Sequence, residues 1–398
     1  MSVDLGARLA SALAAASSDR VVFDLTGVGN QYDHLVRELP GVIVRFAMKA
    51  CPVDEVLTCL ADRGAGFDAA SPAEIEQALR LGVPAGRIHY GNTVKSDVSI
   101  AEAHRLGVRT FATDSVQDVT AIAAHAPGAR VYCRLATSGE GALWGLSRKF
   151  GCSQDDAVRV LTAARAAGLT PAGLSVHVGS QQMTYEAWRR AVDQLADTMV
   201  ALREQGIVLD HVNLGGGLPA LGYLDRHGRR LEPPLDKMFA VLREGMDELR
   251  HLNAAPLDFV MEPGRHLVAD HGAIRAHVYR LTERRQPDGE LVHWLYLSCG
   301  KFNGLYEMDE LCHRLVFPGH LDGEYVAAVV AGPTCDSDDA YGTAHRLVPK
   351  ALASGDPVWV LSAGAYATSY MTQGFNGFGP LPHTTTAHDG IGRAEAVA

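Results

Sequence analysis

Short β-branched runs alternate with amphipathic segments through the first two-thirds of the chain, and this alternation constrains the fold more than any other feature. The runs are VIVRFAM (42–48), GFDAA (66–70), RIHYG (87–91), RTFAT (109–113), RVYCRLA (130–136), LSVHV (174–178), HVNLG (211–215) and DFVME (258–262). The early runs recur roughly every twenty residues, the length of one strand–helix unit. Eight such units predict an α/β fold in which parallel strands close into a TIM-like (β/α)8 barrel. A doubly wound open sheet is the alternative that strand number alone leaves open.

Helix start and stop signals fill the segments between these runs. Ser71 is an expected N-cap, followed by proline and by Glu74 in a capping-box position. Ser115 and Ser153 repeat the cap, each with an aspartate three residues later. The expected helix ends carry Gly82, Gly107, Gly168 and Gly206. The intervening segments are therefore predicted to be helices.

The pattern changes after about residue 265. Long apolar runs with few helices between them follow at 273–285, 290–298, 324–332 and 356–366. We predict a barrel domain over residues 24–264 and a β-sheet or β-barrel domain formed by residues 1–23 and 265–398. The tail after Pro382 is expected to be mobile.

Composition excludes several classes of protein. The net charge is −10 and no run of Lys or Arg occurs, which argues against a nucleic-acid surface. The apolar N-terminal stretch is too short and alanine-rich for a membrane span and carries an acid where a secretory signal is basic, so we expect a cytoplasmic protein. The 7 cysteines show no CxxC spacing, so neither a disulfide framework nor a structural zinc site is indicated.

Polar residues and glycines gather at the expected carboxyl ends of the strands, where β/α barrels carry their chemistry. They are Lys49, Asp68, Asn92, Arg134, His177, Ser180, Gly215, Gly216, Gly217, Glu262 and Arg265. Each has an ordinary structural interpretation: a solvated lysine, a core histidine, a tight glycine turn or a surface ion pair. The apolar and small neighbours of Lys49 instead favour a desolvated amine, which suits a Schiff base.

Together these residues supply an amine, an aromatic plate, a glycine cradle for phosphate, a carboxylate and an arginine. Pyridoxal 5'-phosphate (PLP) requires all five, because its aldehyde, ring, phosphate and pyridine nitrogen each need a partner. A metal site is a poorer fit, since the rim histidine has no second histidine or clustered carboxylates at ligand spacing.

Eight motifs in order identify a resemblance to a known family. They are VRFAMKAC (44–51), GAGFDAAS (64–71), RLATSGEGALWGLSRKFG (134–151), GLSVHVGSQ (173–181), NLGGGL (213–218), EPGR (262–265), GPTCDSDD (332–339) and GAYATSYMTQGFNGF (364–378). The chain resembles the fold-type III PLP decarboxylases that act on ornithine, lysine, arginine and diaminopimelate, and is most similar to the ornithine/lysine branch. The resemblance implies an alanine racemase-like barrel with a C-terminal all-β domain.

The resemblance also implies a role for each matching residue. Lys49 would bind PLP covalently, Glu262 would pair with the pyridine nitrogen and His177 would stack on the ring. The phosphate would be held by Ser180, Gly216, Gly217, Gly264, Arg265 and Tyr366, with Gly215 in the same loop. The cofactor and the surrounding region would be supported by Asp68, Glu74, Arg134 and Lys149.

Substrate-side residues are implied in the same way. Cys335 would control protonation of the substrate carbon and Asp336 would bind its distal amine, both entering from the second protomer of a head-to-tail homodimer. Phe375 and Cys299 would also lie at the substrate. In ornithine decarboxylases the position of Cys299 carries a second aspartate for the distal amine. Losing one charged hydrogen bond costs about 1.5–3 kcal/mol, so ornithine is not a safe assignment.

The expected function is decarboxylation of a basic amino acid of the L-ornithine or L-lysine type, as in polyamine biosynthesis. The alternatives are decarboxylation of a modified amino acid in a specialised biosynthetic pathway, PLP-dependent racemisation, and an inactive regulatory homologue. The last would be expected to lack Lys49, the glycine loop or Cys335, and all are present.

Overall fold

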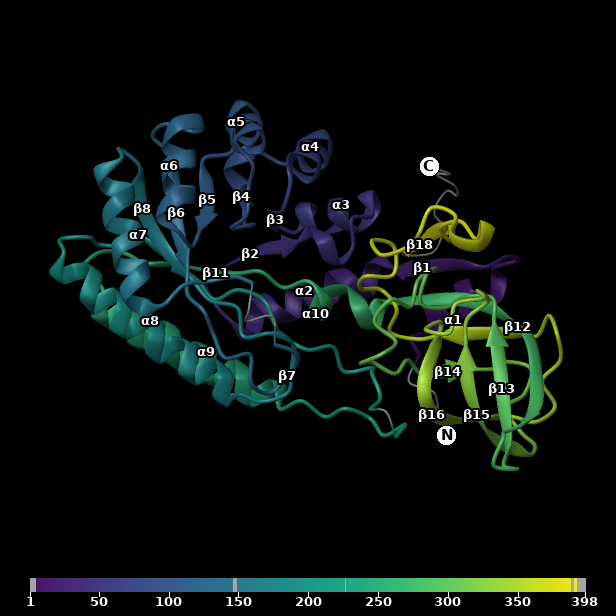
Figure 1. Cartoon of the computed structure of the whole chain (residues 1–398). Coiled ribbons are helices and arrows are strands. Elements are labelled where there is room, and N and C mark those ends of the chain that lie inside the picture. The colour runs from purple at the N-terminus through teal and green to yellow at the C-terminus, as the bar shows by residue number, and fades with distance from the viewer. Residues whose placement is uncertain (1–4, 146–148, 226, 388–389, 392–398) are drawn as a thin grey trace. The chain divides into compact units, whose positions relative to one another are not determined.

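The computed structural model describes residues 5–145, 149–225, 227–387 and 390–391. The chain divides into two compact units. The barrel unit comprises Gly29–Pro219 and Pro233–His266, and the β unit comprises Met1–Val28, Ala220–Glu232 and Leu267–Ala398. Each unit combines segments that are far apart in the sequence. In the β unit, Figure 1 shows the purple N-terminal segment together with green and yellow strands from the later part of the chain.

Eight parallel strands form the closed barrel of the first unit (Figure 1). They are β2 (Val42–Ala47), β3 (Gly66–Ala69), β4 (Ile88–Tyr90), β5 (Thr110–Thr113), β6 (Arg130–Arg134), β8 (Thr170–Ser175), β10 (His211–Asn213) and β11 (Asp258–Met261). Closure comes from β11, which pairs in parallel with β2. The barrel prediction is confirmed, and the open-sheet alternative is excluded.

Helix α2 (Leu25–Glu38) precedes β2, and a helix follows each barrel strand. The helices that follow are α3 (Asp54–Asp62), α4 (Pro72–Arg80), α5 (Asp97–Arg105), α6 (Val116–His125), α7 (Gln154–Ala166), α8 (Glu186–Glu204), α9 (Leu235–Leu252) and α10 (Arg265–Val268). The serine caps are confirmed at Ser71, Ser115 and Ser153, whose hydroxyls accept backbone N–H groups three residues later. The Glu74 carboxylate accepts the N–H of Ala70 at 2.6 Å, which anchors the end of β3 to α4.

Strand β8 begins four residues before the expected run LSVHV. Pro171 lies inside it and opposes Val131, and the register with β6 shifts at the next pair, Tyr132 and Gly173. Proline is tolerated in a strand at such a bulge because its missing N–H interrupts a ladder that is already irregular. A sequence pattern that treats Pro–Ala–Gly as a turn therefore misses this half of the strand.

A nine-stranded sheet forms most of the β unit. Its order is β16 (Ala340–Pro349), β15 (Tyr325–Ala331), β13 (Leu291–Leu297), β12 (Gly272–Arg285), β1 (Arg20–Asp24), β18 (His383–Ala387) and β19 (Gly390–Ile391), with β17 (Pro357–Val360) joining β12 to β14 (Leu315–Val316). Helix α1 (Ala7–Ala15) packs Leu9 and Leu13 into the core of this sheet beside Val22. The expected presence of a C-terminal β domain is confirmed.

The expectation of a mobile tail after Pro382 is wrong for His383–Ala387. This segment is strand β18, which pairs in parallel with β1 from Val21 to Asp24. Its three consecutive threonines are β-branched and suit a strand, and β1 offers them an open edge. Residues 388–389 and 392–398 of the tail lie outside the described part of the chain.

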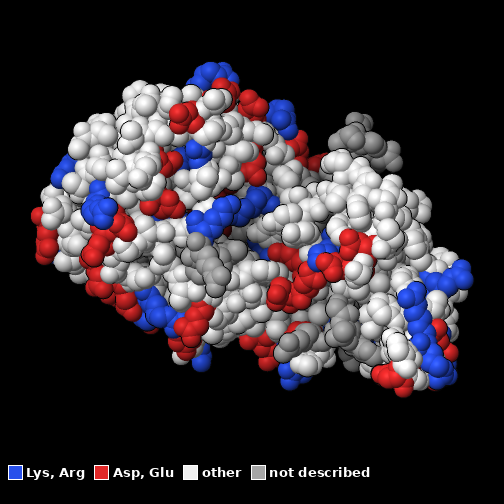
Figure 2. Space-filling view, in the orientation of Figure 1, with Lys and Arg blue, Asp and Glu red and all other residues white. Residues whose placement is uncertain are grey.

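Acidic and basic side chains both occur on the face of the molecule that Figure 2 shows. Within the described residues, no helix is both long and apolar enough to cross a lipid bilayer.

Candidate active site

Lys49 lies directly after β2, in the one-turn 3₁₀ helix Met48–Ala50. Met48, Ala50 and Cys51 are buried, whereas the Lys49 side chain is exposed. The desolvated setting expected from its neighbours is therefore wrong for the described chain. The reason is the tight 3₁₀ turn, which places residues 48 and 51 on the same side and directs the intervening lysine elsewhere.

Two carboxylates meet at the same rim. Asp68 belongs to β3 and Glu262 follows β11 directly. Burial raises the pKa of both carboxyl groups, and repulsion from Glu262 raises that of Asp68 further. The positive charges of Lys49 and Arg134 oppose both shifts. Oδ1 of Asp68 is buried and has no hydrogen-bond partner among the described residues, so the rim contains a polar atom still to be satisfied.

The His177 ring is held neutral after β8. Its Nδ1 accepts the N–H of Gly179 at 3.1 Å, so that nitrogen carries no proton. Burial, and then the positive charges of Arg134 and Lys49, hold the pKa of the imidazole well below its ordinary range. The Thr137 hydroxyl donates to the His177 carbonyl oxygen at 2.7 Å and fixes the backbone. A neutral, oriented ring can stack on a pyridinium without charge repulsion.

The loop Gly215–Gly217 lies too close to its neighbours for side chains. Gly215 and Gly217 have φ values of +69° and +119°, and an added Cβ would lie 1.9 Å from the Val176 oxygen or 2.5 Å from the Gly179 oxygen. Only glycine combines this conformation with this approach. A loop of this kind presents backbone without side chains, which is the form of a phosphate cradle.

The turn before α10 places Arg265 beside Ser180 and Trp144. Arg265 is 4% exposed, donates to the Ser180 hydroxyl at 3.2 Å and stacks its guanidinium 4.9 Å from the Trp144 ring centre. An added Cβ on Gly264 would lie 2.8 Å from the Cβ of Ala50, so this turn packs directly against the Lys49 turn. The structure therefore brings these predicted rim residues together.

Asn213 connects the carboxylate to the glycine loop, and the sequence prediction missed it. Its amide donates to Oε1 of Glu262, and its oxygen accepts the N–H of Gly215 at 2.8 Å. Glu262 returns a bond from its own N–H to the Gly215 carbonyl at 2.8 Å. The signal available in the sequence was an asparagine two residues before a glycine, the pattern of an Asx-turn.

Three further rim residues have supporting positions. Arg134 and Lys149 both lie over the Phe150 ring, at 5.1 and 5.0 Å from its centre. The Asn92 side chain accepts the N–H of Val94 at 3.1 Å and shapes the loop after β4.

The expected substrate-side residues lie in the β unit. Cys335 is exposed beside a hollow of about 550 Å³, and its N–H donates to Asn376 at 3.0 Å. Phe375 packs its ring 4.7 Å from that of Phe302. Tyr366 has a φ of +62° and stacks 5.7 Å from Tyr370.

Asp339 holds the loop that carries Cys335 and Asp336. Its carboxylate accepts the N–H of Lys301 at 2.7 Å, and the N–H and hydroxyl of Thr334 at 3.0 and 2.6 Å. It is 2% exposed, so these bonds replace its hydration. Asp336 itself is partly exposed.

Cys299 lies two residues before Lys301, whose N–H donates to the Asp339 carboxylate. It is 1% exposed, and burial, with the nearby negative charges of Asp19 and Asp339, raises the pKa of its thiol. The thiol is therefore a neutral group in an acidic neighbourhood.

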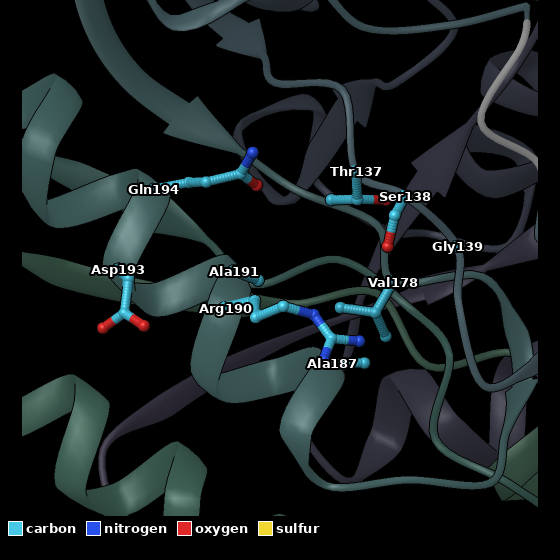
Figure 3. A pocket seen from close by; sticks show the side chains of 9 residues that line it. All are labelled: Thr137, Ser138, Gly139, Val178, Ala187, Arg190, Ala191, Asp193 and Gln194. Atoms are coloured by element: carbon cyan, nitrogen blue, oxygen red, sulfur yellow. The ribbon is translucent and has the colours of Figure 1, made fainter.

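A separate hollow of about 310 Å³ lies between α8 and the loop after β6 (Figure 3). Thr137, Arg190 and Gln194 line it, and Figure 3 shows the Arg190 side chain reaching from α8 toward Ser138. Thr137 is the link to the rim, because its hydroxyl holds the His177 carbonyl. The hollow contains none of the predicted site residues.

The barrel-rim residues fit PLP. Asp68 offers an unsatisfied buried carboxylate oxygen, the glycine loop excludes side chains, and Arg265 with Ser180 forms a cation–hydroxyl pair. The neutral His177 ring and the Asn213-bound Glu262 carboxylate supply the two remaining contacts that the pyridine ring needs.

Comparison with known proteins identifies the class. The family model "Pyridoxal-dependent decarboxylase, pyridoxal binding domain" matches residues 25–269, so the chain belongs to this family. It is 30% identical over 361 residues to a lysine/ornithine decarboxylase of Selenomonas ruminantium, covering 90% of this chain and 87% of that protein. A decarboxylase of Aspergillus flavus is 29% identical over 368 residues, covering 90% and 83%.

A solved structure agrees with these relatives. The crystal structure of the lysine decarboxylase from Selenomonas ruminantium superposes with a TM-score of 0.83 at 28% identity, covering 98% of this chain and 97% of that one. The chain is thus a PLP-dependent amino-acid decarboxylase of the ornithine/lysine branch, which confirms the predicted family, fold, cofactor and type of reaction.

Proposed function

We propose that this enzyme decarboxylates a basic α-amino acid of the L-lysine or L-ornithine type at a site built around Lys49 and Glu262. The observation that carries the proposal is the Asn213 bridge, which fixes Glu262 against the glycine loop at the rim where Lys49 emerges. The names of the relatives point to the same substrates, since the Selenomonas protein is a lysine/ornithine decarboxylase.

In this proposal each residue has a defined task. Lys49 binds PLP covalently, His177 packs its neutral ring against the cofactor, and Glu262 holds the proton on the pyridine nitrogen. The phosphate contacts come from Ser180, Gly215, Gly216, Gly217, Gly264, Arg265 and Tyr366, and the supporting charges from Asp68 and Arg134. Bound PLP supplies a protonated ring that accepts the electron pair released with CO₂.

The active form in this proposal is a homodimer with shared sites. Cys335 and Asp336 enter from the partner, where Cys335 delivers a proton to the substrate carbon and Asp336 binds the distal ammonium. The exposed position of Cys335, on a loop that Asp339 clamps rigidly, supports this role. Phe375 packs beside the same loop through the bond from Cys335 to Asn376.

Cys299 supports a second candidate substrate. Where two aspartates would bind a distal ammonium, this chain offers Asp336 and a buried neutral thiol. A longer or modified side chain, with its charge placed differently, would suit that pair. The Aspergillus relative, named simply a decarboxylase, is as similar to this chain as the lysine/ornithine enzymes are.

The test is release of CO₂ from a panel of L- and D-amino acids, basic, acidic and modified. We expect L-lysine or L-ornithine to be the best substrate, with activity and the visible PLP band both lost in Lys49→Ala. Lys237→Ala is the matched control, because Lys237 lies over Tyr185 on the outer helix α9. Full activity of Lys49→Ala would overturn the proposal, and preference for a modified amino acid would select the second candidate.

Shared sites are tested by mixing two inactive variants. Lys49→Ala and Cys335→Ala subunits, allowed to exchange, form mixed dimers in which one site has both native residues. Random exchange restores about a quarter of the native activity if the sites are shared across a two-fold axis. No recovery in exchanged mixtures would place Cys335 in the site of its own chain.

A further inference from the structure

One layer of the barrel core is polar. Arg45, His89, Tyr132 and His211 come from β2, β4, β6 and β10, which are alternate strands of the barrel. Alternate strands fill one layer of such a core, and branched apolar side chains ordinarily occupy it. Here the three rings contact one another, with centres 5.7 Å apart for His89–Tyr132, 5.9 Å for His89–His211 and 5.5 Å for Tyr132–His211.

Two glycines on the remaining strands make room for this layer. A Cβ on Gly66 of β3 would lie 2.2 Å from the Arg87 carbonyl oxygen and 2.4 Å from Nη1 of Arg45. A Cβ on Gly173 of β8 would lie 2.5 Å from the His211 carbonyl oxygen and 2.8 Å from the His211 ring. Neither glycine has a positive φ, so space rather than conformation requires them. The two glycines therefore accommodate both the neighbouring backbone and the polar side chains.

The layer contains several buried polar atoms without a protein partner. Within the described residues these are Arg45 Nε, His89 Nδ1, Tyr132 Oη and His211 Nε2, with Asp68 Oδ1 at the rim above. His89, Tyr132 and His211 are at most 6% exposed. Buried polar groups are almost always satisfied, and an internal water satisfies two to four of them at once. Such a concentration in one barrel indicates bound water.

The layer reaches solvent at the amino-terminal ends of the strands. Nδ1 of His211 lies 3.2 Å from Oδ1 of Asp210, which accepts a bond of 2.6 Å from Arg130. The Asp210 side chain is 48% exposed. An ionisable group in contact with bulk water therefore touches the polar core.

At its other end the layer meets the carboxylates of the active site. Tyr132 is close enough to Glu262 and Asp68 that their charges, after burial, raise the pKa of its hydroxyl, which stays protonated. Burial and the charge of Arg45 lower the pKa of His89, which stays neutral. A protonated hydroxyl and a neutral imidazole can each accept one proton and release another.

We infer that internal water in this layer connects Glu262 with solvent at Asp210 and carries the proton that Glu262 shares with the pyridine nitrogen. A proton enters from water at Asp210, and each water, imidazole or hydroxyl along the path passes one on as it receives one, so no net charge accumulates. The inference rests on the proposed role of Glu262. It explains why a barrel core has four polar residues where apolar ones would be more stabilising.

The first test is a high-resolution crystal structure of the PLP-bound enzyme. We expect ordered water within hydrogen-bond distance of His89 Nδ1, Tyr132 Oη and His211 Nε2. A dry layer, or direct contacts that satisfy these atoms, would overturn the inference whatever the role of Glu262.

The second test follows the low-field NMR resonance of the pyridinium proton and its exchange with water. Tyr132→Phe removes one hydroxyl from the path and is expected to slow exchange by about tenfold, equivalent to about 1.4 kcal/mol in the barrier. Tyr90→Phe is the matched control, since Tyr90 is the next residue along β4 from His89 and packs against Phe111. Exchange slowed equally in both variants, or in neither, would contradict the path.

Asp210→Asn changes the solvent end of the path. It is expected to slow exchange while leaving PLP content unchanged, with a small fall in melting temperature because the carboxylate also pairs with Arg130. Unchanged exchange in Asp210→Asn would contradict entry of the proton at that residue. If the nitrogen chemical shift of the native cofactor showed an unprotonated pyridine nitrogen, the proposed role of Glu262 would fail instead, so the two failures are distinguishable.

Discussion

Asn213 donates its side-chain amide to Glu262, and through its oxygen it also holds the first glycine of the loop that follows β10. Asn213 therefore positions both the Glu262 carboxylate, proposed to face the pyridine nitrogen, and the glycine loop, proposed to hold the phosphate. The bond stabilises the ionised form of Glu262, because an N–H donor favours a carboxylate, and it opposes the increase in pKa that burial causes.

Asn213→Ala is expected to raise the pKa of the Glu262 carboxyl further. The ionised carboxylate would then exist only at higher pH, so the acid limb of the kcat/KM profile should move to higher pH. Asn253→Ala is the control, since Asn253, which follows α9, donates to the backbone oxygens of Leu209 and Ala255 and not to a carboxylate. An acid limb that stays in place would show that the amide does not control this titration.

Gly264→Ala is expected to weaken PLP binding and to destabilise the chain by about 1–3 kcal/mol, the usual cost of overpacking. The new methyl group would lie 2.8 Å from Ala50 and push the turn before Arg265 away from the Lys49 turn. PLP titration and urea unfolding measure the two effects. Gly86→Ala is the matched control because no atom lies within 4 Å of its added Cβ, and equal losses in both variants would refute the packing argument.

The barrel and the rim could be predicted from sequence because both depend on local signals. Strand runs recur at regular intervals, and Ser71, Ser115 and Ser153 mark helix starts that the structure confirms. The rim follows from the same register, since parallel strands bring their carboxyl ends together. Lys49 and Glu262 lie far apart in sequence yet fall at neighbouring strands for this reason.

Contacts that depend on side-chain direction could not be predicted in this way. The exposure of Lys49 follows from a 3₁₀ turn that no residue pattern signals, and the Asp339 clamp joins Thr334 of its own loop to the distant Lys301 segment. The polar core layer was hidden because His89 and His211 stand in runs that otherwise suit strands. Only closure of the barrel shows that they share one level.

Asp339→Asn is expected to lower activity while leaving the visible PLP spectrum unchanged. The carboxylate accepts three donors while almost fully buried, and an amide can accept fewer, so the loop of Cys335 loses its anchor. A buried donor left unsatisfied costs about 1–3 kcal/mol. Asp338 is exposed on the same loop, so Asp338→Asn should keep near-native activity. A similar loss of activity in Asp338→Asn would show that the hydrogen bonds of Asp339 do not hold the loop in its active position.

The contribution of Asp68 to the stability of the PLP-free chain should fall as pH rises above about 4. The Asp68 carboxyl has a pKa well above its ordinary value of 3.8, so the folded chain retains a proton that the unfolded chain releases. Each pKa unit of difference corresponds to about 1.4 kcal/mol of unfolding free energy. Asp68→Asn should flatten this dependence in urea unfolding, whereas the exposed Asp62→Asn should not. If the unfolding free energy of Asp68→Asn fell more steeply with pH than that of the native chain, the direction assigned to the Asp68 pKa shift would be wrong.

Cys299→Asp tests which substrate the enzyme prefers. A carboxylate at this buried position would lie near Asp19 and Asp339, so without a cation it should be protonated and should destabilise the β unit. A distal ammonium would compensate it, and one charged hydrogen bond of about 1.5–3 kcal/mol would lower KM for L-lysine or L-ornithine at least about tenfold. Cys299→Asn, neutral and of the same shape, should give no such gain. If basic amino acids bound more weakly to the aspartate variant than to the native enzyme, the space around Cys299 would belong to an uncharged part of a modified substrate.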